Sequence, residues 1–510
     1  MTAQELLTSE FATLPDILRE QARERGTKTA VADDIASYTY AELDMLMDRI
    51  AAALQRDGVK QGQAIAVVAS SSINYAAVFL GTLRAGCITA PLAPSSTPEA
   101  LAAMIRDCGA PIVFLDGDNQ AALANQPVAA RQVRLDTGEF EAWLAPAGST
   151  PAPVEIKPED GFNIIYSSGT TGTPKGIVQS HRMRWAHIHR NVEAGYGDAV
   201  TINSTPLYSN TTLVSFFPTI GWGGTVVLMK KFDARGFLQL AQQYRATHAM
   251  LVPVQYQRIM AVPDFDDFDL SSFVMKTSTS APFSAALKAD VVKRWPGRLV
   301  EFYGMTEGGA STGLDCTAFP DKLHTVGQPM PGHDMRLIDD EGNEVAQGET
   351  GEVVGRSPSM MNGYHGRAEA TRDAEWYDKD GNRYIRHGDI GRFDEDGFLI
   401  LMDRKKDLII SGGFNIYPID IEAVLKQHPA VQECTVIGVP SEAWGETPVG
   451  FYVPNTGVDA AADEIVAWTN AQLGKTQRLS ALHAIDELPR SAIGKVLKRE
   501  LRDRLAAQPA

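Results

Sequence analysis

The sequence has few cysteines and no excess of positive charge. Four cysteines occur in 510 residues, at Cys87, Cys108, Cys316 and Cys434, and none belongs to a C-x-x-C pair. A disulfide framework or a zinc site is therefore not expected. Acidic residues outnumber basic ones by 63 to 47, which gives a net charge of −16. This balance disfavours general binding to nucleic acid or to an anionic membrane.

Long apolar runs are also missing. No run approaches the roughly 18 to 20 residues that a membrane-spanning helix needs. The N-terminus carries acidic residues early and has no basic region ahead of an apolar stretch, unlike a secretory signal. Together with the unpaired cysteines, these features predict a cytoplasmic protein.

The sequence lacks a Walker A loop, although residues 165–176 share its richness in glycine. The Walker pattern G-x-x-x-x-G-K-[ST], started at Gly169, would place Pro174 at the second glycine and Gly176 after Lys175. The stretch is nevertheless dense in hydroxyls and glycines, whose side-chain and backbone donors can cradle a polyphosphate. We expect a phosphate-binding turn that follows a strand and does not open a helix.

Alternating strand and helix patterns fill the first part of the chain. Residues 64–69 and 112–115 have the apolar character of buried strands. Thr39 and Glu42 form a capping box ahead of an apolar-periodic run, and Thr97 is a candidate N-cap. Strands that alternate with helices predict an α/β architecture with a largely parallel sheet.

The length of 510 residues predicts at least two domains. A second α/β block includes a strand at 224–229, and the character of the sequence changes near Asp403. We expect a large N-terminal α/β domain, residues 1–402, with layered and mostly parallel sheets and helices. A small α+β C-terminal domain, residues 403–510, would follow on a hinge.

Two acidic motifs have the chemistry of a nucleotide site. Residues 303–307 read Tyr-Gly-Met-Thr-Glu after a predicted strand. An aromatic ring can stack on a purine, a threonine can bond a phosphate, and a carboxylate can hold Mg²⁺. In the motif at 387–391, Asp389 is expected at a turn, where its carboxylate can accept two ribose hydroxyls. A purely structural role is the alternative interpretation of the first motif, and an ordinary Asx turn is that of the second.

Two basic segments lie near the C-terminus. Residues 404–406 read Arg-Lys-Lys and precede the glycine pair Gly412-Gly413, which would tolerate large dihedral changes. Lys495 ends a turn that precedes an amphipathic basic helix. Solvated surface charge is the ordinary explanation of either segment.

Taken together, these motifs resemble the adenylate-forming superfamily, which comprises acyl- and aryl-CoA synthetases, luciferases and peptide-synthetase adenylation domains. The resemblance covers nearly the whole chain and is nearest to the 4-coumarate and fatty-acid CoA ligases. It implies that the loop at 165–176 grips pyrophosphate and that Tyr303 lies along the adenine. It also implies that Asp403 is the pivot between domains and that Lys495 reaches into the main domain.

The resemblance implies three sets of site residues. The catalytic set is Lys495, Thr306 and Glu307, with Glu307 also the magnesium ligand. The nucleotide- and CoA-binding set is Ser167, Ser168, Gly169, Thr170, Thr171, Lys175, Ser280, Ala281, Pro282, Glu301, Phe302, Tyr303, Asp389, Arg404, Lys406, Gly412, Gly413 and Phe414. The acid-pocket set is Tyr208, Ser209, Val254, Thr279, Gly304, Gly308 and Gly309.

Two positions depart from the superfamily pattern. Ser209 stands where relatives often have histidine, so it inherits no catalytic role. Residues 278–280 are polar where a Gly-Ala sequence is usual, which would reshape the acid pocket. His187 and His189 are two apart, and a helix would place them on different faces, so they are not expected to hold a metal.

The resemblance implies an ATP-dependent, AMP-forming carboxylic acid–CoA ligase that uses Mg²⁺ and takes CoA as co-substrate. The acid would be aromatic, arylpropenoic or medium-chain. The alternative is a free-standing acyl-adenylating enzyme that loads a carrier protein, and a luciferase-like oxidase or a nucleotide sensor is the third interpretation. The expected partners are small molecules, with a homodimer as one expected assembly.

Overall fold

The computed structural model describes residues 1–506 apart from 168–174, 190–194, 412–413, 442–443, 459, 475–476 and 492–493. The chain divides into two compact units. Unit 1 comprises Met1–Leu323, Pro329–Asp334 and Gly355–Ile385, and unit 2 comprises His324–Gln328, Met335–Val354 and Arg386–Ala510. The expected domain boundary between residues 402 and 403 is placed at a hinge. A division into compact units does not test a hinge movement, so this boundary stays a prediction.

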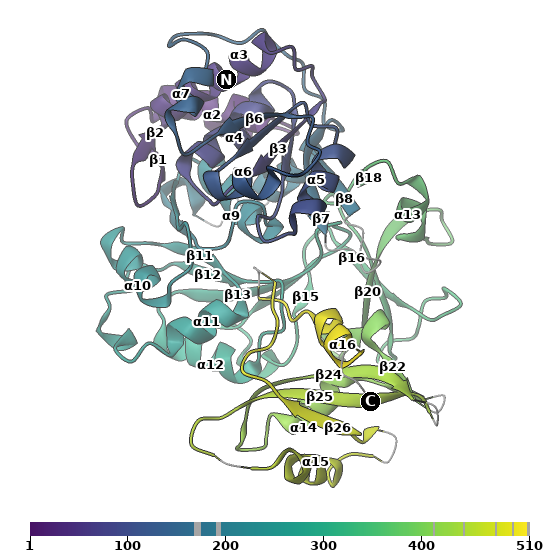
Figure 1. The fold of residues 1–510 in the computed structure, drawn as a ribbon. Helices are drawn as coiled ribbons and strands as arrows, with labels where there is room; N and C mark the ends of the chain where they lie inside the picture. The colour runs from purple at the N-terminus through teal and green to yellow at the C-terminus, as the bar shows by residue number, and fades with distance from the viewer. Residues whose placement is uncertain are drawn as a thin grey trace. The chain divides into compact units, whose positions relative to one another are not determined.

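The first sheet of unit 1 has seven strands in the order β18-β8-β7-β4-β3-β5-β6 (Figure 1). These strands are β3 (Ala64–Val68), β4 (Ile88–Pro91), β5 (Ile112–Leu115), β6 (Arg131–Arg134), β7 (Gly161–Ser167), β8 (Lys175–Ser180) and β18 (Gly363–Tyr364). Pairing is parallel from β7 through β6, whereas β8 and β18 run antiparallel. Every residue of β3 is buried, as expected for a parallel strand with both faces covered.

The second sheet has the order β15-β14-β13-β12-β11-β9-β10-β1-β2, and all its strands except β15 (Gln328–Pro329) lie wholly in unit 1. Those strands are β1 (Thr29–Ala32), β2 (Ser37–Thr39), β9 (Val200–Asn203), β10 (Thr225–Leu228), β11 (His248–Leu251), β12 (Met275–Ser278), β13 (Arg298–Tyr303) and β14 (Thr312–Asp315). The strands from β13 to β1 are parallel, whereas β2 and β14 run antiparallel to β1 and β13. The C-terminal ends of β12 and β13 carry the predicted adenine-contacting turns.

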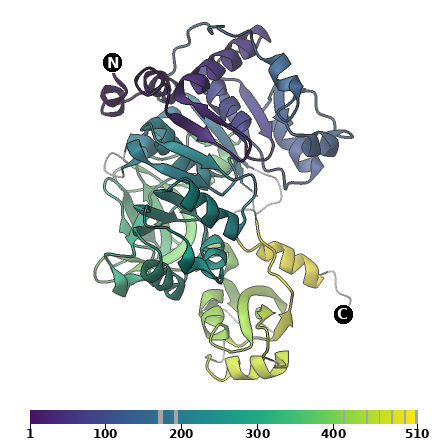
Figure 2. The same cartoon turned by 90° about the vertical axis from the view of Figure 1, so that its left-hand side faces the viewer.

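Helices cover both sheets (Figures 1 and 2). The helices of unit 1 are α1 (Ala3–Leu7), α2 (Leu14–Glu24), α3 (Tyr40–Arg56), α4 (Ile73–Arg84), α5 (Pro98–Asp107), α6 (Gly117–Leu123), α7 (Gly138–Trp143), α8 (His181–His189), α9 (Asn210–Gly221), α10 (Ala234–Gln243), α11 (Pro253–Met260), α12 (Ala285–Arg294) and α13 (Ala368–Asp373). α8 packs on β7 and β8, α9 packs on β9 to β11, and the two helices contact each other. This helix pair therefore links the two sheets.

The capping signals act where the sequence predicts them. Thr39 and Glu42 form the capping box of α3, and Thr97 caps α5. Asp233, which is not among the expected caps, is the N-cap of α10, so this helix begins at Ala234. These short side chains accept the backbone N–H groups that the first helical turn leaves unpaired.

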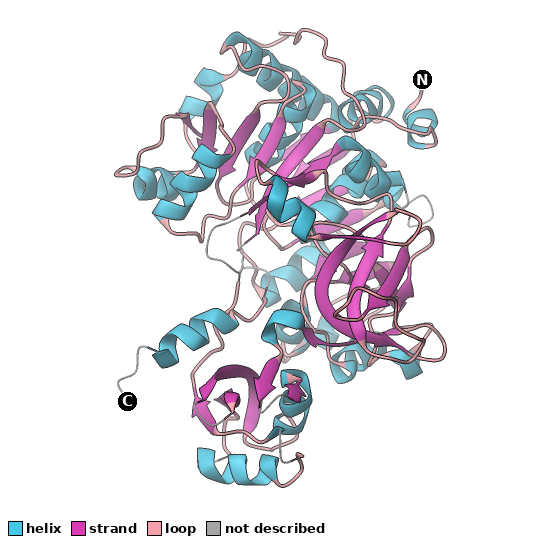
Figure 3. Ribbon diagram, turned by 90° about the vertical axis from the view of Figure 1, so that its right-hand side faces the viewer, coloured by secondary structure: helices cyan, strands magenta, loops and turns pink. Residues whose placement is uncertain are grey.

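Unit 2 contains all or part of the remaining strands, of which β15, β16, β17 and β20 are shared with unit 1, and the helices that its described residues form (Figure 3). They are β15 (Gln328–Pro329), β16 (Asp334–Ile338), β17 (Gly351–Arg356), β20 (Arg383–Phe393), β21 (Leu399–Arg404), β22 (Ile409–Ser411), β23 (Phe414–Ile416), β24 (Val431–Ser441), β25 (Gly445–Pro454), β26 (Ala481–Ala484), α14 (Pro418–Leu425), α15 (Ala462–Asn470) and α16 (Lys498–Ala506), while β19 (Glu375–Tyr377) pairs with β20 inside unit 1. The last sheet has the order β23-β22-β25-β24 with β26 on β25. The predicted α/β fold with a small C-terminal α+β part is confirmed. Within the described residues, no helix is long and apolar enough to cross a membrane.

Candidate active site

The Tyr303–Glu307 motif leaves β13 where the strand ends. Tyr303 is its last residue and pairs with Thr312 of β14. In the turn that follows, Thr306 and Glu307 are half-buried. The carbonyl of Thr306 accepts a 2.7 Å hydrogen bond from Nε2 of Gln179, and the carbonyl of Glu307 accepts one of 2.8 Å from the amide of Met361. The backbone of the motif is therefore held on both sides of Glu307.

Gly308 has a packing reason to be glycine. Its φ is +81°, in the left-handed region, and an added Cβ would lie 1.7 Å from the carbonyl oxygen of Ser359. A bridge between Gly308 and Met360 occupies this space. Gly304 is similarly crowded, since a Cβ there would lie 2.7 Å from Oγ of Ser311. Packing within the protein is enough to explain why both positions are glycine. Their predicted role in lining the pocket for the acid substrate stays a prediction.

Tyr364 joins the phosphate-loop lysine to the predicted magnesium ligand. Its hydroxyl donates a 2.9 Å hydrogen bond to Oε1 of Glu307. Nζ of Lys175 lies 5.1 Å from the centre of the Tyr364 ring. Burial, followed by the nearby charge of Glu307, raises the pKa of the Tyr364 hydroxyl, which therefore stays a donor at neutral pH.

The predicted phosphate loop lies between two strands. β7 precedes it, and Lys175 begins β8, so the segment does not open a helix, as predicted. Ser168, Gly169, Thr170 and Thr171 lie outside the described residues, and so does the side chain of Ser167. Their contacts with pyrophosphate stay predictions.

Glu301 turns toward α12. Its carboxylate forms a buried ion pair with Lys288, whose Nζ also donates to the carbonyl of Leu323 at 2.8 Å. Burial raises the pKa of Glu301 to about 7, although the Lys288 charge acts in the opposite direction. Phe302, the next residue, lies across from Gly313 and points to the other face of the sheet. The structure thus gives Glu301 a protein partner, and its nucleotide role stays a prediction.

Polar contacts join two segments of the predicted acid pocket. Ser209 is the N-cap of α9, and Thr211 in the first turn of α9 lies 2.6 Å, Oγ1 to Oγ, from Ser280 after β12. Ser280 has a φ of +81°, which is rare for a residue with a Cβ. Oγ of Ser278 is buried with no hydrogen-bond partner in the described part of the chain.

The remaining predicted pocket and adenine residues are placed as follows. Half-buried positions are held by Tyr208, by Val254 in α11, and by Thr279 and Ala281 in the turn after β12, whereas Pro282 is exposed. Gly309 is buried with a φ of +87°. The structure brings Ser280 together with α9, and the substrate and nucleotide roles of these residues stay predictions.

Asp389 lies in a strand, and the predicted turn is wrong. β20 runs through Arg383–Phe393, and Asp389 is the register partner of Arg404 in β21. The strand accommodates the left-handed backbone of Gly388, whose φ is +68°. The register of the β20–β21 pair shifts nearby, after Ile390. The side chains of Arg404, Lys406 and Phe414 lie outside the described part of the chain, as do Gly412 and Gly413.

A tight turn in unit 2 presents Lys495. The amide of Ser491 donates to the carbonyl of Lys495 at 2.8 Å, and Oγ of Ser491 accepts from the amide of Lys495 at 3.2 Å. Arg490 braces the turn, since its Nη1 donates to the carbonyl of Gly494 at 2.8 Å. A second branch of the Arg490 guanidinium pairs with Glu433 at 2.8 Å. The loop backbone carrying the predicted catalytic lysine is thus built from local contacts.

The donor chemistry at Glu307 fits Mg²⁺ bound to a nucleotide better than a protein-only metal site. Among the described residues, no group of three His, Cys, Asp or Glu side chains could hold a metal. Mg²⁺ is commonly bound by one or two carboxylates together with phosphate oxygens. His187 is buried and His189 is exposed on α8, as their spacing predicts.

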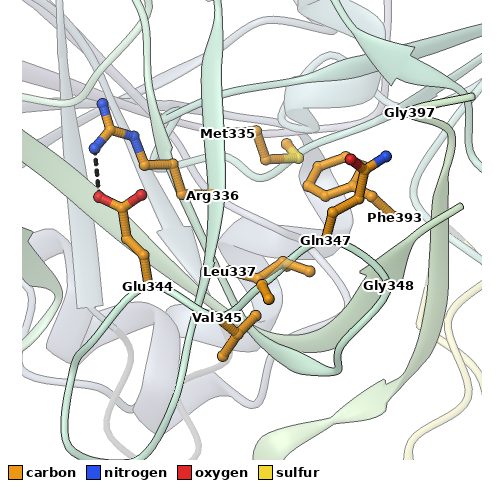
Figure 4. A pocket seen from close by; sticks show the side chains of 10 residues that line it. Met335, Arg336, Leu337, Glu344, Val345, Gln347, Gly348, Phe393 and Gly397 are labelled. Carbon is orange, nitrogen blue, oxygen red and sulfur yellow. Dashed lines mark hydrogen bonds and ion pairs between the residues drawn. The ribbon is translucent and has the colours of Figure 1, made fainter. Parts of the chain in front are cut away.

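A hollow of about 300 Å³ in unit 2 includes none of the predicted site residues among those that line it (Figure 4). Its walls include Met335, Leu337 and Phe393, and Arg336 pairs with Glu344 at 2.6 Å. Arg336 and Glu344, the charged residues that line the hollow, therefore form an ion pair with each other. It has no set of converging catalytic side chains.

Sequence reasoning missed three of the contacting residues. Tyr364, Gln179 and Lys288 carry no motif of their own, and each lies in a segment that reads as ordinary strand or helix. The only local signal is their polarity at positions that the periodic pattern would fill with apolar residues. Their partners are set by packing between distant segments.

The order of these motifs, on an α/β fold with a small C-terminal α+β part, defines an adenylate-forming enzyme. The sequence matches the AMP-binding enzyme model over residues 18–365 and the AMP-binding enzyme C-terminal domain model over residues 420–495. The chain belongs to the AMP-binding enzyme family, as the resemblance predicts.

Relatives of this chain match it over nearly its whole length. A feruloyl-CoA synthase of Amycolatopsis sp is 33% identical over 491 residues, covering 95% of this chain and 97% of that protein. A fatty acid–acyl-carrier-protein ligase of Streptomyces coeruleorubidus is 30% identical over 512 residues, covering 97% of each. The crystal structure of ATP-bound MatB from Rhodopseudomonas palustris has a TM-score of 0.86 and 28% identity, covering 99% of each chain.

Proposed function

We propose that the protein is an ATP-dependent carboxylic acid–CoA ligase. The observation that carries this proposal is the grouping of Lys175 and Glu307 around Tyr364, next to the Tyr303–Glu307 turn. A cation and a carboxylate brought together in this way suit a nucleotide phosphate with its metal. Similarity to a feruloyl-CoA synthase supports the assignment of CoA as the thiol.

In the first step, a carboxylate oxygen of the acid attacks the α-phosphorus of ATP. The new O–P bond forms as the bond from the α-phosphorus to the bridging oxygen breaks, and pyrophosphate leaves. Lys175 and Lys495 would offset the repulsion between two anions, and Thr306 would bond the α-phosphate. Glu307 would hold Mg²⁺, which when bound neutralises phosphate charge.

In the second step, the CoA thiol, as thiolate, attacks the carbonyl of the acyl-adenylate. The C–S bond forms, the C–O bond to phosphate breaks, and AMP leaves. A thiol with a pKa of about 8.5 is a few per cent ionised at neutral pH, so no dedicated base is required. Lys495 would act only in the first step, and a hinge near Asp403 would withdraw it before the second.

The acid is proposed to be aromatic, arylpropenoic or medium-chain. The feruloyl-CoA relative favours an arylpropenoic acid. Hydroxyls at Thr211 and Ser280 would suit a polar substituent on such an acid. The cytoplasmic location and the homodimer are retained as predictions.

Release of pyrophosphate from ATP across a panel of acids, with and without CoA, tests the proposal. We expect release with an arylpropenoic acid and CoA-dependent formation of AMP. The second candidate, loading of a carrier protein, is favoured by the similarity to a fatty acid–acyl-carrier-protein ligase. AMP formation that requires a carrier protein and ignores CoA would select it, whereas no pyrophosphate with any acid would overturn both.

A further inference from the structure

Three fully buried polar side chains meet on the first sheet of unit 1. Asn163 comes from β7, Gln179 from β8 and Arg184 from α8, and each has 0% exposure. Nε of Arg184 donates to Oδ1 of Asn163 at 2.9 Å, and Nη2 donates to Oε1 of Gln179. The same Oε1 accepts from Nδ2 of Asn163 at 2.8 Å. The three side chains form one connected network.

This network fixes the orientation of the Gln179 amide. Oε1 accepts from two donors, so rotating the amide by 180° would set its NH₂ group against both of them. Nε2 is therefore directed to the carbonyl of Thr306, at 2.7 Å. Since the network lies in the 161–189 segment and Thr306 follows β13, the bond connects the two sheets of unit 1.

Burying the Arg184 guanidinium carries a large desolvation cost. Within the described residues no ion pair joins it to a carboxylate, and its guanidinium lies 5.4 Å from the centre of the Phe217 ring. Burial lowers the pKa of Arg184 to about 9, so it is still charged at neutral pH. Well-packed apolar side chains are often at least as stable as a buried charge, so stability alone does not account for the network.

Gln179 completes a two-sided restraint on Glu307. It holds the peptide before this residue through Thr306, and the amide of Met361 holds the peptide after it. Both predicted catalytic side chains of the motif, Thr306 and Glu307, branch from this fixed backbone. A rigid backbone keeps such groups in place without reorganisation when the nucleotide binds.

We propose that Gln179, oriented by Arg184 and Asn163, is a positioning residue for adenylation. It holds the Thr306–Glu307 peptide in the geometry that the α-phosphate requires. This inference rests on the proposed function, because it assigns Thr306 and Glu307 to the nucleotide. It adds Gln179, Arg184 and Asn163, a buried hydrogen-bonded network, to the site residues that the motifs identify.

Gln179→Glu separates positioning from stability. A glutamate keeps the oxygen that accepts from both Arg184 and Asn163, but its second carboxylate oxygen replaces the N–H donor that faces the carbonyl of Thr306. Gln21→Glu is the matched control, since Gln21 is 2% exposed and its Nε2 donates to the carbonyl of Gly221 at 2.9 Å. Gln179→Met provides a second variant without the donor, in case the carboxylate prevents folding.

The full-length variants are compared by pyrophosphate release, thermal midpoint and amide hydrogen exchange of the peptide that contains Thr306. We expect Gln179→Glu to lower the kcat of adenylation about 10- to 100-fold, with the KM for ATP nearly unchanged. Its midpoint should stay within about 3 °C of wild type, and exchange at the motif should become faster. Gln21→Glu should leave kcat and motif exchange unchanged.

Wild-type kcat and exchange in folded Gln179→Glu or Gln179→Met would overturn the positioning role. Equal losses in Gln179→Glu and Gln21→Glu would also overturn it, because they would reflect general destabilisation. A wild-type enzyme that releases no pyrophosphate would instead refute the proposed function. In that case hydrogen exchange alone decides whether Gln179 restrains the motif.

Discussion

A 2.9 Å hydrogen bond joins the Tyr364 hydroxyl to the Glu307 carboxylate across 57 positions of sequence. The bond occupies Oε1 of Glu307 and thereby fixes the orientation of the carboxylate, whose other oxygen stays available to a metal. Nζ of Lys175 lies 5.1 Å from the centre of the same tyrosine ring. Tyr364 thus sets the relative placement of two residues that the motifs identify separately.

Tyr364→Phe should weaken adenylation while keeping the ring beside Lys175. We expect an approximately 10-fold lower rate of pyrophosphate release and a higher Mg²⁺ concentration for half-maximal rate, because partners of metal ligands tune them by such factors. The rise in thermal midpoint caused by Mg²⁺ and ATP should also shrink. Tyr377→Phe is the control, since its exposed hydroxyl bonds Glu375 at 2.9 Å. Equal responses of the two variants would contradict the prediction.

Lys495→Ala should abolish adenylation and spare thiolation of a supplied acyl-adenylate. Loss of one fixed charge at the reacting phosphate costs on the order of 100- to 1000-fold in rate. The two half-reactions are measured separately, with Lys293→Ala, at an exposed position of α12, as the control. Equal loss of both half-reactions in Lys495→Ala would refute the alternating use of the C-terminal domain.

Thr211→Val should impair binding of the acid more than binding of ATP. The valine is nearly isosteric, but it leaves the Ser280 hydroxyl without its 2.6 Å partner. We expect the KM for the acid to rise roughly 3- to 10-fold, the equivalent of about 1 kcal/mol. Thr225→Val, which removes a buried hydroxyl bonded to the carbonyl of Thr29, is the control. An unchanged KM for the acid would place Thr211 outside the pocket.

Lys276 should make stability depend on pH. Its Nζ donates to the carbonyls of Trp295, Pro296 and Gly297 at 3.1, 2.6 and 2.8 Å, and burial lowers its pKa from 10.5 to about 7. Between these values the unfolded chain binds the proton more tightly than the folded chain does. The contribution of Lys276 to stability therefore rises with pH through this window, and below pH 7 its full desolvation cost applies.

The difference in free energy of unfolding between wild type and Lys276→Met measures this effect. We expect wild type to gain relative to the variant from pH 7 to 9.5, by at most about 1.4 kcal/mol per pH unit. The three carbonyl contacts hold the ammonium form and limit the gain. A difference that is flat over this range would show that the folded pKa stays near 10.5.

Much of the fold could be predicted because its signals are local. Residues 112–115 form β5 as expected, and the cap at Thr97 sets the start of α5. The turn expected at Asp389 is wrong, because this residue lies in β20, which pairs with β21. Hydrogen bonds to a neighbouring strand are invisible in the sequence of one segment.

The sequence by itself determined the order of motifs, the α/β class and the membership of the adenylate-forming enzymes. Those properties depend on residue type, short-range spacing and apolar periodicity. Only the tertiary structure decided that Tyr364 holds Glu307, that Lys288 occupies Glu301 and that Gln179 holds Thr306. The reason is that these pairs join distant segments, and their meeting depends on how the sheets and helices of unit 1 pack and on which way each side chain points.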